Sequence, residues 1–371
     1  MKFKKLAILY WSMFFLSIKC NLIDLKQSST VCLYSNNKTN KYYQNIKSAF
    51  IKFNIKFNEV DLIDKDLSNL YILFDILNIG IDELPKHYVV YQTQDLDTIE
   101  LSNDYISKML NAICVWDFKL ENINKYKAKI HHYYYFPSEY EYADPIILVC
   151  FLPIEVLKNY KEIVSTSNIN DSDVSSHLPT LFVYTVLQKP NDIIEAGVSW
   201  GVTTKIFYKS SQITHSRLIG IDCMQHCSSV YDNLNNAKFC CMDDLKFPEY
   251  YKKKLKGNKS DLIFIDTSHT YKQTMSEIKC FLDILAKNGI MLFHDSNVTP
   301  LKNNTMYFRI NNTFGEAHGN TKGVTFALKN YFNINFKEDE YSNLHFKHNN
   351  IFWHMIHYPF CNGLTILKRI D

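Results

Sequence analysis

The sequence predicts an α/β protein with two Rossmann-like domains, of which the second is a doubly wound parallel sheet. Short apolar runs alternate with amphipathic patterns along the 371 residues, which indicates strands connected by helices. The polar, turn-rich stretch 165–176, STSNINDSDVSS, predicts a linker between the two domains. An apolar content of 46% is sufficient for two ordinary cores.

The first twenty residues differ from the rest of the chain. Lys2, Lys4 and Lys5 precede an apolar run that ends at Ile18. The run is short for a bilayer span and typical of a signal-peptide core, although the cleavage pattern is poor. Residues 1–20 are therefore predicted to be a signal peptide or an anchor, with a buried first element as the alternative. A signal would place the chain in the secretory pathway, in the ER or Golgi lumen or outside the cell; without one it would be cytoplasmic.

Residues 29–155 are predicted to form the first domain. Amphipathic helices are expected at 42–53 and over the first part of 104–118, which leads into a strand. Helices between strands imply a parallel sheet with right-handed crossovers. Its other strands are expected at 29–36, 55–62, 70–77, 86–95, 130–140 and 145–153.

Residues 177–371 show the alternation more clearly and are predicted to form the doubly wound sheet. Helices are expected at 178–188, from about 202, and at 272–289 and 323–332. Strands are expected at 192–197, 217–222, 237–243, 260–266, 290–295 and 364–370. Because such sheets bind ligands outside the carboxyl ends of their strands, the residues there are the candidates for function.

A pair of glycines follows the first strand of this sheet. Gly197 and Gly201 lie close together, although the whole chain has only ten glycines. Glycine tolerates positive φ and lets the backbone approach a ligand, which suits the first turn of a nucleotide-binding sheet. Ser199 occupies the place of the middle glycine of the dinucleotide fingerprint, so pyrophosphate binding is not favoured. An ordinary strand-to-helix turn is the alternative.

Acidic residues follow the next four strands of the same sheet. They are Asp222, the pair Asp243 and Asp244, Asp266 and Asp295. Asp222 follows Glu195 by twenty-seven residues, where a carboxylate can accept the hydroxyls of a ribose. Each aspartate could instead cap a helix or begin a turn. Their repetition at one edge of the sheet favours a binding crevice.

These motifs together resemble the class I S-adenosylmethionine-dependent methyltransferases. DIIEAGVSWG is similar to their first motif, LIGID to the second and CCMDD to the third. Residues 260–297 resemble the branch of cephalosporin-hydroxylase-like and sugar or macrolide O-methyltransferases. In that branch an Asp-x-x-His element precedes a Gly-Gly-Ile-Ile-x-x-His-Asp strand, whose first glycine is Asn288 here. The resemblance covers 176–371, about half of the chain.

The resemblance implies a cofactor role for most of these residues. Asp222 would bind the ribose of S-adenosylmethionine, and Asp243 the adenine. The loop around the methionine part would be formed by Glu195, Gly197, Ser199 and Gly201, and Asp266 would be a further cofactor-binding residue.

The same resemblance implies how a hydroxyl acceptor is activated. His269 would be the catalytic base, since imidazole titrates near neutral pH; a turn or N-cap residue is the alternative. Asp266 and Asp295 would hold Mg²⁺, which prefers oxygen ligands and lowers the pKa of a bound hydroxyl. Metal-dependent relatives have another acidic or amide ligand where this chain has His294 and Ser296. A site without metal is therefore the alternative.

The first domain resembles the amino-terminal half of glycosyltransferases that have two Rossmann-like domains. The resemblance covers about 29–155 and depends on HYVVYQTQDL, on the Trp-Asp segment at Trp116, and on the apolar run 145–153. The second half of such enzymes is absent, so no glycosyl transfer is expected from this unit. It predicts a glycan-binding or scaffold role, with an unrelated α/β domain as the alternative.

The chain as a whole is therefore predicted to methylate a hydroxyl of a sugar, glycan or glycoside. A catechol-like small-molecule O-methyltransferase and a non-catalytic glycan-binding protein are the alternatives. The net charge of +3 and the lack of a dense Lys/Arg block predict no nucleic-acid partner. Contact with a membrane is expected only through an N-terminal anchor.

Overall fold

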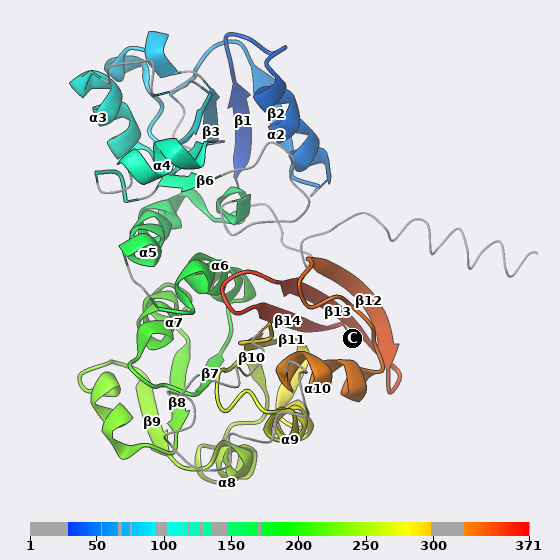
Figure 1. The fold of residues 1–371 in the computed structure, drawn as a ribbon. Helices are drawn as coiled ribbons and strands as arrows, with labels where there is room; N and C mark the ends of the chain where they lie inside the picture. Colours follow the sequence, from blue (N-terminus) through cyan, green and yellow to red (C-terminus); the bar gives the residue numbers. More distant parts are fainter. Residues whose placement is uncertain are drawn as a thin grey trace, which may run out of the picture. The chain divides into compact units, whose positions relative to one another are not determined.

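The computed structural model describes residues 29–52, 54–65, 69–74, 76–93, 96, 102–117, 119–126, 129–131, 133–135, 147–169, 172–297 and 323–370. The chain divides into two compact units, Met1–Lys161 and Glu162–Asp371, which are described one at a time (Figure 1). The predicted signal or anchor at 1–20 lies outside the described residues.

The first unit is built on a fully parallel sheet with the strand order β2-β1-β3-β4-β5-β6. The chain reverses direction across the sheet between β1 and β3, as in doubly wound folds. The strands are β1 (Thr30–Tyr34), β2 (Phe57–Val60), β3 (Asn69–Phe74), β4 (Tyr88–Gln92), β5 (Val115–Asp117) and β6 (Tyr133–Tyr135). Its described helices are α2 (Lys41–Lys52), α3 (Asn103–Asn111) and α4 (Leu120–Tyr126), and α5 (Leu157–Ile169) spans the boundary between the two units. The Rossmann-like prediction for this unit is confirmed.

Two predictions for this part of the chain need correction. The apolar run 145–153 is not a strand: its described part forms the short 3-10 helix η3 (Ile147–Phe151), which is buried at every position. An apolar run predicts burial, but by itself it does not distinguish a strand from a buried helical turn. The predicted linker 165–176 is not a loop throughout, because α5 continues to Ile169 and buries Ser167.

The second unit contains a sheet of eight strands with the order β12-β13-β14-β11-β10-β7-β8-β9. Its helices are α6 (Leu178–Gln188), α7 (Val202–Thr214), α8 (Phe247–Lys254), α9 (Tyr271–Leu282) and α10 (Gly323–Phe332). Its strands are β7 (Asp192–Ala196), β8 (Arg217–Asp222), β9 (Ala237–Cys241), β10 (Ser260–Ile265), β11 (Leu285–His294), β12 (Ser342–His348), β13 (Ile351–Tyr358) and β14 (Leu364–Ile370).

The strands β7 to β11 are parallel to one another, and the chain reverses direction after β9. Helices cover both faces of the sheet, as Figure 1 shows. Ile263 and Ile265 belong to a core that includes residues of α8, α9 and α10. Phe264 points the other way, because side chains alternate along a strand, and its ring lies 5.3 Å from that of Phe207 on α7. The doubly wound prediction is confirmed.

The sequence reading missed the hairpin of β12 and β13. These strands pair antiparallel, with His348 opposite Ile351 across a turn of two residues. The turn residues Asn349 and Asn350 both have positive φ, which is typical of a type I′ hairpin turn. This asparagine pair is the sequence feature from which the hairpin could have been predicted. The predicted helix 272–289 is also too long, since it ends at Leu282.

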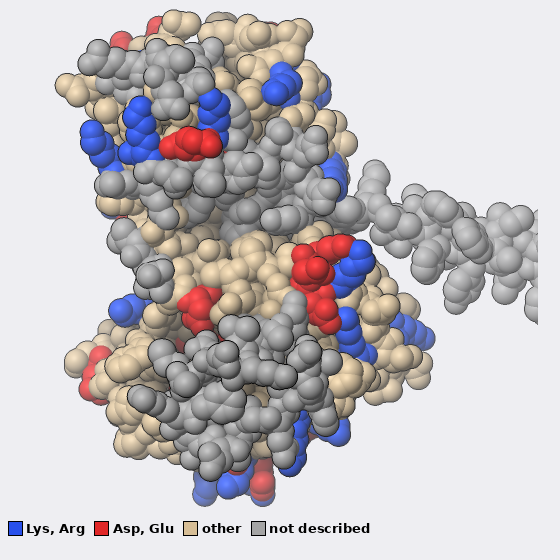
Figure 2. Space-filling model, viewed as in Figure 1, with Lys and Arg blue, Asp and Glu red and all other residues tan. Residues whose placement is uncertain are grey.

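The described surface carries both signs of charge. Figure 2 shows basic and acidic residues interspersed on one face, without a continuous basic stripe in the part that is described. None of the helices among the described residues is long and apolar enough to cross a membrane. The predictions about nucleic acid and an N-terminal anchor stay predictions.

An ion pair ties together the amino ends of β7 and β8. Arg217 donates to both carboxylate oxygens of Asp192, from Nε at 2.8 Å and from Nη2 at 2.6 Å. Tyr251 donates a further hydrogen bond to Asp192, over 2.5 Å. Asp192 is 9% exposed, so loss of its partner would leave a nearly buried carboxylate without a countercharge.

We therefore expect Arg217→Ala to lower the free energy of unfolding of this unit by about 1–3 kcal/mol. Urea unfolding followed by tryptophan fluorescence measures it. Lys252→Ala is the control, because Lys252 forms an exposed ion pair with Asp283, and such pairs contribute little. Equal losses in the two variants would contradict the structural role of Arg217.

Candidate functional site

The loop between β7 and α7 is held in a conformation that glycine permits. Gly197, Ser199 and Gly201 have φ of 89°, 47° and 73°. A Cβ on Gly197 would lie 1.8 Å from the carbonyl oxygen of Asp266, so only glycine fits there. The loop therefore packs directly on the end of β10, and the structure brings two of the predicted site regions together.

Glu195 stabilises this loop from the protein interior. Its side chain is fully buried and accepts hydrogen bonds from Thr203 at 2.6 Å, Thr204 at 2.8 Å and Tyr231 at 2.7 Å. Burial raises the pKa of Glu195 to about 7. In this arrangement the carboxyl group fixes the start of α7 to β7 and does not face solvent. The sequence reading missed its three hydroxyl partners, of which Tyr231 is distant in sequence and belongs to no motif.

Asp222 holds the same loop from the neighbouring strand. Its carboxylate accepts the backbone N–H groups of Val198 at 3.0 Å, Ser199 at 3.2 Å and Met224 at 2.8 Å. Trp200, at the tip of the loop, is 83% exposed. The predicted ribose ligand and the glycine loop therefore form one hydrogen-bonded unit at the ends of β7 and β8.

Asp243 lies at the end of the next strand, where it caps the short helix η7 (Asp244–Lys246). Its side chain accepts from the backbone N–H of Leu245 at 3.0 Å and lies 3.8 Å from the ammonium of Lys246. The carboxylate is half exposed and oriented by its own turn. It remains accessible to a ligand.

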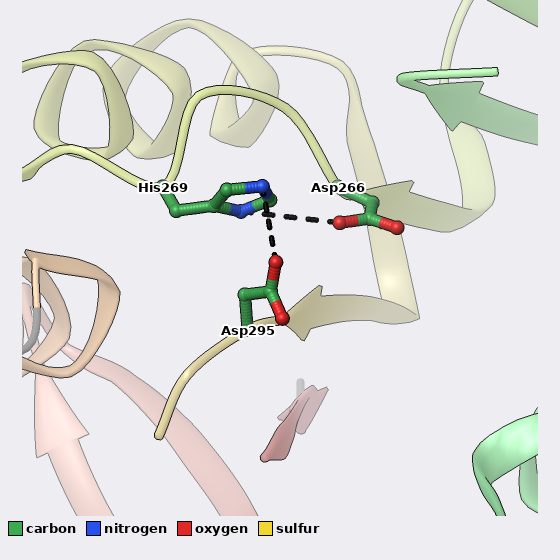
Figure 3. A group of neighbouring side chains, drawn as sticks. All are labelled: Asp266, His269 and Asp295. Atoms are coloured by element: carbon green, nitrogen blue, oxygen red, sulfur yellow. Dashed lines mark ion pairs between the residues drawn. The ribbon is translucent and has the colours of Figure 1, made fainter. Parts of the chain in front are cut away.

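Two carboxylates and two imidazoles gather where β10 and β11 end. Figure 3 shows His269, on the loop before α9, directed at Asp266 and Asp295. His269 Nε2 lies 3.0 Å from Asp295 Oδ2, and His269 Nδ1 lies 3.9 Å from Asp266 Oδ1. His294 Nδ1 lies 3.2 Å from Asp266 Oδ1 and 3.4 Å from Asp295 Oδ1. His269 and Asp295 also have positive φ, an uncommon conformation that concentrates at functional sites.

His294 acts as a countercharge for the two aspartates. Burial disfavours its charged form, but the carboxylates of Asp266 and Asp295 outweigh burial and raise the pKa of His294 to about 10. Burial would raise the pKa of Asp266, yet His294 and His269 lower it. Burial dominates at Asp295 and raises its pKa. The sequence reading had noted His294 only as a departure from metal-dependent relatives, whereas the structure makes it part of the cluster.

The donor atoms fit a divalent cation in number and spacing. One ligand atom each from Asp266, His269 and Asp295 lie within 4.8 Å of one another. Asp295 is 2% exposed and its Oδ1 makes no hydrogen bond, so an acceptor oxygen is left over inside the cluster. A set that mixes carboxylate and imidazole suits Mn²⁺, Fe²⁺ or Zn²⁺ better than Mg²⁺, which prefers oxygen alone.

Residues 194–296 match a family model described as a methyltransferase domain. Similar solved structures include an SAH-bound methyltransferase from Podospora anserina, with 14% identity over 59% of this chain and 89% of that chain, and a TM-score of 0.37. An O-methyltransferase from Bacillus cereus in complex with SAH has 16% identity over 58% and 91%, and a TM-score of 0.36. A TDP-rhamnose 3′-O-methyltransferase of calicheamicin biosynthesis has 14% identity over 74% and 99%, and a TM-score of 0.34. The search of curated protein sequences gave no match.

The close packing of Gly197 leads to a test of the loop. We expect Gly197→Ala to lower the free energy of unfolding by about 2–4 kcal/mol, because the added Cβ collides with backbone at positive φ. Ser199→Gly, in the same loop, is the matched control and removes a strained φ, so it should cause no loss. Thermal unfolding measures both. A harmless Gly197→Ala would show that the loop is not packed on β10 as described.

Proposed function

We propose that this chain methylates a hydroxyl oxygen of a sugar, glycan or glycoside with S-adenosylmethionine as the methyl donor, because residues 194–296 match a family model described as a methyltransferase domain. The observation that carries the proposal is the cluster of Asp266, His269 and Asp295 beside the glycine loop. A cofactor loop and a proton-accepting group thus lie at the carboxyl ends of adjacent strands, where doubly wound sheets bind ligands.

The cofactor is proposed to lie over the ends of β7, β8 and β9. Gly197, Ser199 and Gly201 would face its methionine part, and Asp266 would lie close by. Asp222, whose carboxylate already orders the loop through three backbone N–H groups, is proposed to accept a ribose hydroxyl as well. Asp243 would accept from the adenine amino group. Glu195 acts through the loop, since its carboxylate is fully buried and bound to three hydroxyl groups of the protein.

The chemistry requires the acceptor hydroxyl to be positioned and deprotonated. S-adenosylmethionine supplies a methyl group that is already activated, so much of the rate comes from holding the acceptor oxygen in line with it. His269 is proposed to take the hydroxyl proton. The carboxylate of Asp295, 3.0 Å from Nε2, orients the ring and stabilises the imidazolium that forms. Nδ1 is the proposed base.

A divalent cation at Asp266 and Asp295 is proposed as a second way to activate the acceptor. Such an ion would lower the pKa of the hydroxyl when bound. His269 cannot fill both roles at once, because a neutral imidazole that binds a metal through one nitrogen carries its proton on the other and has no lone pair left to accept a second proton. Asp266 and Asp295 would hold the ion whether His269 is a base or a ligand. With the ion bound, His294 would either lose its proton or keep it as a second positive charge beside the two carboxylates.

The sugar acceptor rests on the sequence resemblance of both halves of the chain. The first unit has the parallel sheet expected for a Rossmann-like glycan-binding domain, and its role is proposed on that basis alone. Turnover of a panel of sugars, glycosides and catechols, followed by transfer of labelled methyl, would separate a carbohydrate acceptor from a small aromatic one.

The cofactor site is tested by calorimetric titration of the full-length protein with S-adenosylmethionine. We expect a dissociation constant on the order of micromolar. Gly197→Arg should abolish binding, and Asp222→Ala should weaken it roughly 10- to 100-fold, because a charged acceptor and the order of the loop are lost together. Asp232→Ala is the control, since Asp232 is exposed and lies outside the loop. No binding by the unaltered protein would reject the proposed activity.

The metal is tested by titrating the protein with Mn²⁺ and following the EPR signal of the free ion. Asp295→Asn should weaken binding at least about tenfold, because one anionic ligand is lost; Asp283→Asn, in an exposed ion pair, should not. His269→Asn distinguishes its two roles. Unchanged Mn²⁺ affinity with lost turnover identifies the base, and a loss of both identifies a ligand. Equal Mn²⁺ affinity in Asp295→Asn and the unaltered protein would rule out this metal site.

A further inference from the structure

A second pair of carboxyl groups lies next to the loop that carries His269, with Glu277 buried and Asp244 partly buried. Asp244 begins η7, directly after the proposed adenine contact Asp243, and Glu277 lies on α9. Glu277 is 1% exposed. The two side chains lie within hydrogen-bonding reach of each other. Neither is a member of the cluster of Asp266, His269 and Asp295.

Each carboxyl has one satisfied oxygen and one without a partner. Gln273 Nε2 donates to Asp244 Oδ1 at 3.0 Å, and the hydroxyl of Thr267 donates to Glu277 Oε1. Asp244 Oδ2 and Glu277 Oε2 are buried and have no other hydrogen-bond partner. Two ionised carboxylates would repel one another in this place, whereas one shared proton satisfies both free oxygens.

The pair connects two parts of the site. Thr267 lies between Asp266 and His269, so its bond to Glu277 ties the loop that carries the proposed base to α9. The bond from Gln273 and the shared proton tie the same helix to η7. Thr270, which caps α9, accepts from the backbone N–H of Gln273 at 3.3 Å and anchors the other end of the loop.

We propose that Glu277 is a positioning residue: as a neutral acid it donates to Asp244 and accepts from Thr267, and so it holds the 266–270 loop against η7. The inference deepens the proposed function and rests on it, because that function is what assigns a catalytic base to the 266–270 loop. The hydrogen-bond network itself does not depend on the proposed function. Loss of the proton leaves two facing carboxylates that repel each other, and movement of Glu277 away from Asp244 displaces the Thr267 that is bonded to it. The loop that carries His269 is then ordered while the pair holds its proton and loosened when the proton is lost.

The groups around Asp244 and Glu277 favour a pair that keeps one proton and loses it as the pH rises. Burial, followed by the charge of Asp244, raises the pKa of Glu277 well above its ordinary value. Burial also raises the pKa of Asp244, and Asp243 adds repulsion. Among the described residues, Cys280 and Cys223 also face the pair; burial raises the pKa of both thiols, so they stay neutral. Because the folded pKa of Glu277 is raised, its stabilisation is complete below about pH 4.5 and declines as pH rises toward the folded pKa.

Hydrogen exchange of the amides in 266–270, measured on the full chain without cofactor or acceptor, tests the proposal. As the pH is raised from about 4.5 through the titration of the pair, the protection of these amides, corrected for intrinsic rates, should fall at least about tenfold in the unaltered protein. Glu277→Gln should remove that pH dependence, because its amide donates to Asp244 permanently while its oxygen still accepts from Thr267. Glu277→Ala should lose protection at every pH.

Two further variants keep the test decisive. Glu249→Gln is the matched control, since Glu249 is an exposed glutamate on α8, and it should behave as the unaltered protein. In Asp244→Asn the amide donates to Glu277 in place of the shared proton, so this variant should also show no pH dependence. It provides the same test if Glu277→Gln does not fold. The same pH profile in the unaltered protein, Glu277→Gln and Asp244→Asn would overturn the proposal. Since no cofactor is present, a failure of S-adenosylmethionine binding would be recognised separately.

Discussion

The contact on which the site depends is the packing of Gly197 against the backbone of Asp266. Any side chain at Gly197 would overlap the carbonyl oxygen of Asp266, so the end of β7 and the end of β10 meet without a layer of side chains between them. This contact places the loop of β7 beside the residues that follow β10. Glu195 and Asp222 then hold the loop from two strands, one through hydroxyl groups and one through backbone N–H groups. Cofactor binding and acceptor activation are therefore proposed for adjoining parts of one sheet edge.

The parallel sheet also explains why so much charge is buried there. Carboxyl ends of parallel strands lie at one edge, so Asp266 and Asp295 are brought together by β10 and β11. Two neighbouring carboxylates with little access to water need a positive charge beside them, and His294 supplies it as an imidazolium. Within the described part of the chain no basic side chain is paired with Asp244 or Glu277, and a shared proton is proposed to take its place. The two clusters thus stabilise acidic side chains with little access to water in two ways, one by a neighbouring imidazolium and one by a shared proton.

The sequence predicted the parts of the fold that have strong periodicity. The helix at 178–188 and the strands that begin with Asp192, Arg217 and Ser260 lie where they were expected, since each combines an apolar run with a clear boundary. The β12–β13 hairpin was missed because SNLHFKH alternates polar and apolar residues weakly on a partly exposed edge. The run at 145–153 was misread because burial can be met by a 3-10 helix as well as by a strand. Local pattern predicts burial more directly than it predicts backbone shape.

For the site, the sequence predicted residues at strand ends but not their partners. Motif spacing identified Asp222, Asp266, His269 and Asp295, because each follows a strand of the same sheet. It could not identify Tyr231 or Glu277, which reach Glu195 and Thr267 only through tertiary packing. It also assigned Glu195 to the cofactor, whereas the structure shows its oxygens occupied by three hydroxyl groups of the protein. A strand-end carboxylate can thus serve a ligand or the loop, and only the fold distinguishes these.

The most direct test of the account is a crystal structure of the protein with S-adenosylhomocysteine. We expect the nucleoside over the ends of β7 and β8, with a ribose hydroxyl on Asp222, and the sulfur facing the side of the site that carries His269. A ligand bound elsewhere, or a site that stays empty at saturating concentration, would contradict the assignment of this sheet edge to methyl transfer.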